Sequence, residues 1–400
     1  MRIAMISEHA SPLAVLGGAD AGGQNVHVAS LSLALAERGH TVDVYTRRDH
    51  HATPERMRLG PGVEVIQVPA GPPRPVAKDD LLPYMGEFGD WLTVFWADRT
   101  PDVVHAHFWM SGVASAHARR RMPLPSAQTF HALGSVKRRH QGRQDPSPDE
   151  RVDIETALAL RSDAVIATAT DEVRELLALG APPEVMHVVP CGVDAFPPVP
   201  PSDSRWRSGR GRILSLGRLV ERKGVDTVIA ALADVPEADL VVAGGPPTGF
   251  DADPEVLRLR AVAAEAGLAD RVSFIGPISR TEVPGLLRSA DVVACTPWYE
   301  PFGIVPLEAM ACGRPVVASA VGGLLDTVID GVTGMHVPPR DPARLAVVLR
   351  ELLADPGRRD ALGAAGHARV LAEYTWPTVA EATEGVYRRI VSPVTSGRVG

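Results

Sequence analysis

Two glutamates in the segment WYEPFGIVPLEAMACG (298–313) stand close enough in the chain to act on one ligand. Glu300 precedes a predicted helix and Glu308 lies inside it. Three chemistries suit two carboxylates: a glycosidase pair, ligands of a metal ion, or acceptors for the hydroxyls of a polyol. No Asp or His stands beside them to complete a metal site, and a glycosidase would not need the two segments described below. The pair therefore favours hydroxyl binding, with a helix capped by surface glutamates as the structural alternative.

The backbone between these glutamates is predicted to open the helix. The N–H groups of Phe302, Gly303 and Ile304 would then have no partners inside the helix. Such groups can donate to a phosphate or to a sugar oxygen. The segment thus combines acceptors for hydroxyls with donors for an anion.

A basic pair occurs upstream in SLGRLVERKGVD. Arg218 comes just after a predicted strand, and Lys223 stands where a helix is predicted to begin. Two cations at this spacing can clamp a diphosphate and stabilise it as it leaves. A solvated loop with a capping role is the alternative.

A glycine-rich loop follows the first strand. Gly22 and Gly23 stand directly before the first long amphipathic segment, NVHVASLSLALAERG. Glycine allows the backbone to approach a ligand closely, and a helix N-terminus attracts anions. The loop therefore suits a phosphate or diphosphate, although many doubly wound domains have such a loop without using it. It is not a GxGxxG fingerprint, which argues against a dehydrogenase.

Short apolar runs alternate with helical patterns in two series, which predicts parallel sheets covered by helices on both faces. We expect an N-terminal Rossmann-like domain at 1–192, a proline-rich linker at 193–208, a C-terminal one at 209–375, and a helix at 376–400 that packs back on the first. Ligands bind beyond the carboxyl ends of strands in open α/β sheets, so a cleft between the domains is the expected site. The strand candidates are RIAMIS, TVDVYT, VEVIQV, DVVHAH, PSAQTF, DAVIAT and MHVVP, then RILSLG, DLVVAG, RVSFIG, DVVACT, PVVAS and GMHVP.

The bulk composition narrows the class of protein. The chain has 400 residues, a net charge of −7 and no run of about 18 apolar residues, so neither nucleic acid nor a transmembrane helix is expected. Its three cysteines have no CxxC spacing and predict neither a disulfide framework nor a structural zinc site. We expect a cytoplasmic protein, with peripheral contact at the inner face of a membrane left open; the oligomeric state is not predicted.

The combination of motifs resembles the family-four retaining glycosyltransferases of the GT-B fold. Within that family, the N-terminal segments resemble the branch of sucrose-phosphate synthases and actinobacterial inositol-phosphate N-acetylglucosaminyltransferases. The resemblance runs from Met1 to about Val391. The segments that carry it are WYEPFGIVPLEAMACGRPVVAS, GRLVERKG, GGLLDTVIDGVTGMHVPPRDP, GGADAGGQNVHV and TFHALGSVKR.

The resemblance implies roles for particular residues. Glu300 would meet hydroxyls of the donor sugar, Glu308 the nucleotide ribose, and His131 would sit beside the reacting sugar. The other donor-binding positions are Arg218 and Lys223 on the diphosphate, Gly22 and Gly23 closing over the phosphates, and Phe302, Gly303 and Ile304. His131, Arg218, Lys223 and Glu300 would form the catalytic set, with His131 positioning the sugar or stabilising charge.

The resemblance also implies a metal-independent transfer with retention of configuration. No cofactor is expected; the donor would be a nucleoside diphosphate sugar, with UDP as the first expectation and GDP as the second. A DxD at Asp251 and Asp253 precedes PEVLRLR and is interpreted as a turn and helix cap rather than a metal site.

The acceptor is expected on the N-terminal half. The inositol-phosphate branch has a tyrosine and a threonine where this chain has Phe108 and Ala132, which weakens inositol phosphate as the acceptor. A small sugar, cyclitol or natural product is the leading hypothesis, a membrane lipid the alternative, and a non-catalytic nucleotide-sugar-binding protein the third. The candidate acceptor residues are Asn25, Lys78, Trp109, Lys137 and Arg151, with the basic run Lys137 to Arg143 open to a phosphorylated acceptor or an anionic lipid surface.

Overall fold

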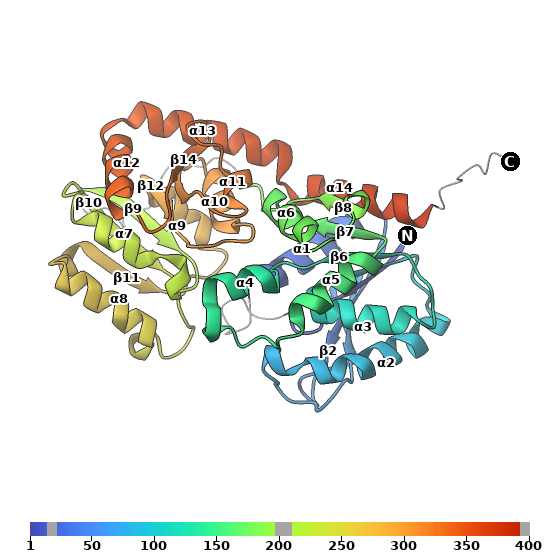
Figure 1. Ribbon diagram of the computed structural model, residues 1–400. Coiled ribbons are helices and arrows are strands. Elements are labelled where there is room, and N and C mark those ends of the chain that lie inside the picture. The colour runs from blue at the N-terminus through green and yellow to red at the C-terminus, as the bar shows by residue number, and fades with distance from the viewer. Residues whose placement is uncertain (14–21, 197–209, 393–400) are drawn as a thin grey trace. The chain divides into compact units, whose positions relative to one another are not determined.

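The computed structural model of the protein describes residues 1–13, 22–196 and 210–392, which fold into two compact units. Unit 1 holds the described residues up to 192 together with 376–392, and unit 2 holds those from 193 to 375. Most of the proline-rich linker predicted at 193–208 lies outside the described residues, as do the first glycines of the loop before the first helix and the chain after residue 392. Each unit contains one mostly or wholly parallel sheet (Figure 1).

The sheet of unit 1 has eight strands in the order β3-β4-β2-β1-β5-β6-β7-β8. Every strand predicted in this half is confirmed, and β3 is an addition, antiparallel to β4 at the edge. The β3 sequence RMRLG is only partly buried and has no apolar face, so no hydrophobic period marks it. The strands are β1 (Arg2–Ile6), β2 (Thr41–Arg47), β3 (Arg56–Gly60), β4 (Val63–Val68), β5 (Val103–His107), β6 (Ser126–Thr129), β7 (Ala164–Ala167) and β8 (Met186–Val188).

The helices of unit 1 divide between the two faces of its sheet. The chain runs from β1 to β2 in one direction and crosses from β4 to β5 in the other, so right-handed connections place α1 and α2 on opposite faces. The last helix, α14, packs on α1, and Arg38 Nε donates to Glu384 Oε2 at 2.6 Å between them. The helices are α1 (Gly23–Glu37), α2 (Met85–Asp98), α3 (Trp109–Arg119), α4 (Gly134–Gln141), α5 (Arg151–Arg161), α6 (Thr170–Ala178) and α14 (Trp376–Val391).

The sheet of unit 2 has six parallel strands in the order β11-β10-β9-β12-β13-β14, and every predicted strand is confirmed. Its strands are β9 (Gly211–Leu216), β10 (Ala238–Ala243), β11 (Val272–Gly276), β12 (Val292–Cys295), β13 (Val316–Ser319) and β14 (Gly334–Val337). Its helices are α7 (Val225–Leu232), α8 (Pro254–Glu265), α9 (Val283–Ser289), α10 (Ile304–Ala311), α11 (Leu324–Thr327), α12 (Pro342–Ala354) and α13 (Pro356–Glu373). Helices α12, α13 and α14 follow one another directly at the end of the described chain.

Each sheet has one point where the strand order reverses. In unit 1 it lies between β1 and β5, and in unit 2 between β9 and β12. The connections leave these neighbouring strands toward opposite faces, so the loops at their carboxyl ends part and leave room for a ligand. The carboxyl ends of β1 and β5 in unit 1, and of β9 and β12 in unit 2, are therefore the expected ligand-binding ends.

Candidate active site

Lys223 and Glu300 meet at the reversal point of unit 2. Lys223 ends a short 3-10 helix (Glu221–Lys223) after β9, and Glu300 follows β12. The Lys223 ammonium donates to Glu300 Oε2, and both side chains are largely enclosed. Two backbone links hold the loops together: Thr296 Oγ1 donates to the Gly224 carbonyl at 2.8 Å, and the Trp298 N–H donates to the Arg222 carbonyl at 2.9 Å. The loops that carry Lys223 and Glu300 are therefore hydrogen-bonded to each other.

The charge state of this pair is set by its neighbours. Burial alone would raise the pKa of Glu300, but Lys223, Arg222 and Arg218 together outweigh it and hold that pKa below its ordinary value. Glu300 is therefore a carboxylate at neutral pH. Arg218 is itself exposed after β9. Together with Lys223 and Arg222 it stabilises the negative charge of the largely enclosed Glu300 carboxylate.

Glu308 lies on α10, close to the same strand end. Burial raises the pKa of the Cys295 thiol to about 12. The nearby charge of Lys223 lowers that pKa, and the charges of Glu300 and Glu308 raise it. The structure thus brings these three predicted residues together around the end of β12. Each is presented by a different segment: a 3-10 turn, a loop and a helix.

Arg280 holds Glu308 in the structure. Its Nη1 donates to Glu308 Oε1 at 3.1 Å, and its Nη2 donates to Asp194 Oδ2 at 3.0 Å. Burial raises the pKa of Glu308 to about 7, against the opposing attraction of Arg280. Sequence reasoning missed Arg280 and Asp194. Arg280 follows the carboxyl end of β11, which is the same positional signal that identified Arg218.

Glycines shape the loop that carries Glu300. Gly303 has φ +92 and precedes the first residue of α10, which confirms that this segment opens the helix. Gly322 has φ +50, and a Cβ there would run into the Glu300 carbonyl oxygen. The Gly323 N–H donates to that same oxygen at 2.9 Å. The pair Gly322–Gly323 was not predicted as part of the site, although adjacent glycines after a strand signal a close backbone approach.

His131 lies at the reversal side of unit 1, just after β6. Its Nε2 is 3.0 Å from Nδ1 of His107, the last residue of β5. The rings of His27 and His105 complete a cluster, with His27 5.1 Å from His131 and His105 4.0 Å from His107 between ring centroids. Sequence reasoning identified His131 alone, although HAH at the end of the neighbouring strand was a signal for His107.

These histidines are neutral. Burial lowers the pKa of His27 to about 4 and that of His105 to about 3, and it holds the pKa values of His107 and His131 well below the ordinary range. Each ring also disfavours a charge on its neighbours. Within the described residues the cluster has no carboxylate partner that would offset this burial. It is a set of dipoles, not of ions.

The backbone at this end of unit 1 is strained. Phe108 has φ +79 and ψ +156, and His131 has φ +61. Such conformations are rare for residues other than glycine and tend to mark functional sites. The strained Phe108 is fixed by its N–H, which donates to the Thr129 carbonyl at 2.8 Å, and by its carbonyl, which accepts from Gln128 Nε2 at 3.1 Å.

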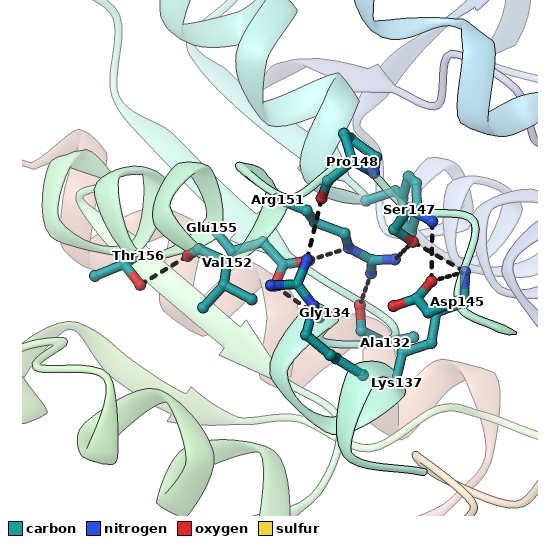
Figure 2. Close-up of polar contacts among 12 residues, drawn as sticks. Ala132, Gly134, Lys137, Asp145, Ser147, Pro148, Arg151, Val152, Glu155 and Thr156 are labelled. Carbon is teal, nitrogen blue, oxygen red and sulfur yellow. Dashed lines mark hydrogen bonds and ion pairs between the residues drawn. The ribbon is translucent and has the colours of Figure 1, made fainter. Parts of the chain in front are cut away.

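Arg151 is enclosed in a hydrogen-bond network (Figure 2). Its guanidinium donates to Glu155 Oε1 at 2.7 Å, to Ser147 Oγ at 3.1 Å and to the Ala132 carbonyl at 2.6 Å. The same guanidinium lies 5.1 Å from the centroid of the Phe108 ring. Arg151 therefore braces the residue that follows His131, and its contact with an acceptor stays a prediction.

Lys137 and the basic run of α4 are paired with acids. Lys137 Nζ lies 2.8 Å from Asp145 Oδ1 and 2.9 Å from Ser147 Oγ (Figure 2). Further ion pairs join Arg138 to Asp149 and Arg139 to Glu175. These carboxylates offset much of the positive charge that a membrane surface would require.

The remaining acceptor candidates differ in accessibility. Asn25 is buried; its Oδ1 accepts from the Gly22 N–H at 2.9 Å and its Nδ2 donates to the Ser11 carbonyl at 2.8 Å, so it anchors the loop before α1. Trp109 is buried at the start of α3. Lys78 is half-buried, with Nζ 5.8 Å from the Phe108 ring centroid. Gly22 and Gly23 stand at the start of α1, and their contact with a donor stays a prediction.

Asp253 caps α8, accepting from the N–H groups of Glu255 and Val256, which confirms its predicted capping role. Among the described residues, no three His, Cys, Asp or Glu side chains are grouped to hold a metal ion. In the same part of the chain, no helix combines the length and the apolar character needed to cross a membrane.

Comparison with known proteins connects both units to one class of enzyme. The model described as "Glycosyltransferase Family 4" matches residues 21–195, and the model described as "Glycosyl transferases group 1" matches residues 201–369. The D-inositol 3-phosphate glycosyltransferase of Xylanimonas cellulosilytica is 41% identical over 96% of this chain and 96% of its own length. That of Acidothermus cellulolyticus is 39% identical over 97% of this chain and 90% of its own length.

Solved structures give the same fold. Sucrose-phosphate synthase from Thermosynechococcus elongatus matches with a TM-score of 0.89 and 34% identity, covering 97% of this chain and 98% of its own. HepE of Anabaena, solved in complex with UDP and glucose, matches with a TM-score of 0.74 and 22% identity, covering 97% of this chain and 99% of its own. The expected GT-B fold is confirmed by these matches and by the two doubly wound sheets.

Proposed function

This chain belongs to the GT-B glycosyltransferases, and we propose that it moves a hexosyl group from a nucleoside diphosphate sugar to a hydroxyl of a small sugar, cyclitol or natural product, with retention of anomeric configuration. One observation carries the proposal: Lys223, Glu300 and Glu308 gather around the end of β12. The Lys223 ammonium, held in place by its ion pair, can bind a diphosphate. The two carboxylates can accept hydrogen bonds from the hydroxyls of a sugar and of a ribose.

Lys223 and Arg218 would bind the diphosphate of the donor. Negative charge grows on this group as its bond to the anomeric carbon breaks, and cations already held in place stabilise that charge in the transition state. The N–H groups at Phe302, Gly303 and Ile304 would add donors at the start of α10. Once a phosphate shares the charge of Lys223, the Glu300 carboxylate can accept hydroxyls of the transferred sugar. Glu308 would accept both hydroxyls of the ribose.

The transfer itself follows from this geometry of charges. An acceptor hydroxyl forms a bond to the anomeric carbon on the face that the diphosphate leaves, and its proton passes to a leaving phosphate oxygen. His131 positions the transferred sugar, and Gly22 and Gly23 close over the phosphates. The cations carry the electrostatic role that a metal ion serves in other transferases, so the reaction is proposed to be metal-independent.

The acceptor class is proposed from the relatives and from unit 1. Relatives named D-inositol 3-phosphate glycosyltransferase make a cyclitol phosphate the first acceptor to assay. Phe108 lacks a hydroxyl, yet Lys78 and Arg151 both lie near its ring, so cationic groups are present for a polar acceptor. Unphosphorylated cyclitols and sugars form the second group to assay. Asn25, Trp109 and Lys137 are the other proposed acceptor residues.

Calorimetry with UDP, GDP and ADP is the most direct test of the donor half. We expect UDP to bind most tightly and GDP to be the next best. With the matching nucleotide sugar, transfer to D-inositol 3-phosphate or an unphosphorylated acceptor should give a product whose anomeric NMR signals show the configuration of the donor. Binding without transfer or donor hydrolysis would instead indicate a nucleotide-sugar-binding protein, and an inverted product would exclude retention.

Metal removal tests the electrostatic part of the proposal. We expect full activity after dialysis against EDTA, because Lys223 and Arg218 supply the positive charge at the diphosphate. The assay should be repeated with added Mg²⁺ as a control for residual metal. A loss of activity in EDTA that Mg²⁺ restores would contradict the metal-independent mechanism.

A further inference from the structure

Three of the four histidines in the cluster of unit 1 have hydrogen bonds from which the position of the ring proton can be worked out. His105 is the clearest of them. Thr129 Oγ1 donates its proton to the Ile166 carbonyl at 2.9 Å, so it can only accept from His105 Nε2, which lies 2.9 Å away. A neutral His105 then has a bare Nδ1, which accepts from the Tyr387 hydroxyl at 2.6 Å. The His105 ring is thereby locked against the His107 ring at a centroid distance of 4.0 Å.

The His107 ring has only one hydrogen-bond partner among the described residues. Its Nδ1 lies 3.0 Å from His131 Nε2, while its own Nε2 is buried without a partner. A proton on Nε2 would leave a buried N–H with nothing to accept it, which is rarer and less favourable than an unshared acceptor lone pair. The proton of His107 is therefore on Nδ1, where it donates to His131 Nε2.

This bond fixes the other ring. His131 Nε2 accepts, so a neutral His131 must carry its proton on Nδ1, the other nitrogen of its ring, to which no described residue is hydrogen-bonded. The His27 ring packs edge-on against His131 at 5.1 Å, and His107 is nearly parallel to it at 5.2 Å, so the imidazole is held on two sides. The left-handed backbone of His131 sets the direction from which the ring enters this cluster.

We propose that His107 is a positioning residue that holds His131 as the Nδ1–H tautomer, so that His131 acts on the transferred sugar as a neutral hydrogen-bond donor. The proposal rests on the proposed function, which places His131 beside that sugar. With its Nε2 lone pair occupied by His107, His131 is not a proton acceptor at that atom. Its contribution is a dipole whose direction is set before the substrate binds, which avoids reorganisation during transfer.

The test compares His107→Asn with His107→Ala in the full chain. The amide nitrogen of asparagine lies near the position of the imidazole Nδ1 and can still donate to His131, whereas alanine cannot. Long-range 1H–15N correlation spectra of protein labelled with 15N-histidine report the tautomer directly, with His131→Gln to assign the signals. We expect the Nδ1–H form in the wild type and in His107→Asn, and the Nε2–H form, which free imidazole prefers, in His107→Ala.

Kinetics provide the second readout. We expect kcat to fall about 10- to 100-fold in His107→Ala and to recover to within about threefold of wild type in His107→Asn. UDP affinity should stay within about twofold in both, because neither variant changes the residues proposed to bind the ribose and clamp the diphosphate, Glu308, Lys223 and Arg218. His117→Ala, which removes a partly exposed histidine of α3 that pairs with Asp90, is the control and should leave kcat unchanged.

The outcomes separate the two proposals. An Nε2–H signal for His131 in the wild type overturns the inference without any variant, and so does retention of the Nδ1–H form in His107→Ala. If His107→Ala does not fold, the wild-type and His107→Asn spectra still decide. If the tautomers respond as expected but no nucleotide sugar is a donor, the proposed function fails while the positioning role of His107 stands.

Discussion

The side chains at the two reversal points of this protein differ in charge: they form ion pairs in unit 2 and are neutral in unit 1. In unit 2, buried carboxylates are matched by cations: Glu300 by Lys223 and Glu308 by Arg280. In unit 1, the corresponding strand ends carry neutral imidazoles whose partners are hydroxyls, a thiol and each other. The comparison indicates that unit 2 is suited to a ligand that brings charge and unit 1 to a ligand that brings hydroxyls.

The backbone differs in the same way. In unit 2, the positions near Glu300 that have positive φ are occupied by Gly303 and Gly322, and glycine adopts this conformation without strain. Unit 1 places Phe108 and His131 in such conformations, and they are two of the three non-glycine residues with positive φ among those described. Unit 1 therefore keeps a side chain at these two positions despite the cost of backbone strain. Such strain is expected where the side chain itself has a role. Unit 2 instead keeps the backbone close and unstrained.

Acidification should distinguish the two units most strongly. Native His27, His105, His107 and His131 stay neutral below pH 6.5 while unfolded histidines take up protons, so stability is lost as the pH falls from about 6.5 toward 4. Each contributes up to about 1.4 kcal/mol per pH unit. Glu172 in unit 1 and Glu308 in unit 2, with pKa values raised to about 7, act in the opposite direction between pH 7 and 4.5.

Hydrogen exchange measures this effect in each unit separately. After correction for intrinsic exchange, amides of β5 and β6 should lose several kcal/mol of protection between pH 6.5 and 5, four histidines being set against Glu172. Amides of β9 and β12 should keep or gain protection over the same range, because Glu308 takes up a proton in the native state before it does so in the unfolded chain. An equal loss in both units would show that the histidine cluster does not dominate the acid response.

Replacement of Lys223 by alanine should have the next largest effect. The change removes a cation from the proposed leaving group and leaves Glu300 buried without its ion-pair partner. We expect kcat/KM to fall about 100- to 1000-fold, with a smaller loss of UDP affinity, because charge on the diphosphate grows in the transition state. Arg210→Ala, which removes an exposed cation at the other end of β9, is the matched control. Comparable kinetics for both variants would refute the role of Lys223.

The sequence predicts the candidate site of unit 2 better than that of unit 1. Lys223, Glu300 and Glu308 stand in short segments whose strand, turn and helix are determined locally, so their convergence follows from the rule that ligands bind at carboxyl strand ends. Arg280 and Asp194 escape notice because their contacts join segments 86 residues apart. His107 is missed for a similar reason. Its role depends on the His131 ring, which follows β6, the strand that pairs with β5. The strain at Phe108 has no signature in residue type at all.

Glycine at 322 offers a smaller and more local test. Gly322→Ala would force a Cβ into the Glu300 carbonyl oxygen, whereas Gly331→Ala meets nothing within 4 Å, although both glycines have positive φ. The strain of a left-handed alanine, about 1–2 kcal/mol, is therefore shared, and the clash adds about 1–3 kcal/mol in Gly322→Ala alone. Urea unfolding should show this difference, and only Gly322→Ala should lose activity. Equal destabilisation would mean that the Glu300 loop can move aside.

Glu308→Gln should give the smallest effect, and it tests whether the charge of this carboxylate matters. Glutamine keeps an acceptor for Arg280 but cannot ionise, so UDP binding should weaken about tenfold, or about 1.4 kcal/mol. In the wild type, UDP should bind more tightly at pH 8 than at pH 6, because the ribose needs the carboxylate form of a group whose pKa is about 7. Calorimetry should show that dependence lost in Glu308→Gln and kept in Glu351→Gln, a change on α12. A wild-type affinity that is flat across this range would place the charge needed for nucleotide binding elsewhere in unit 2.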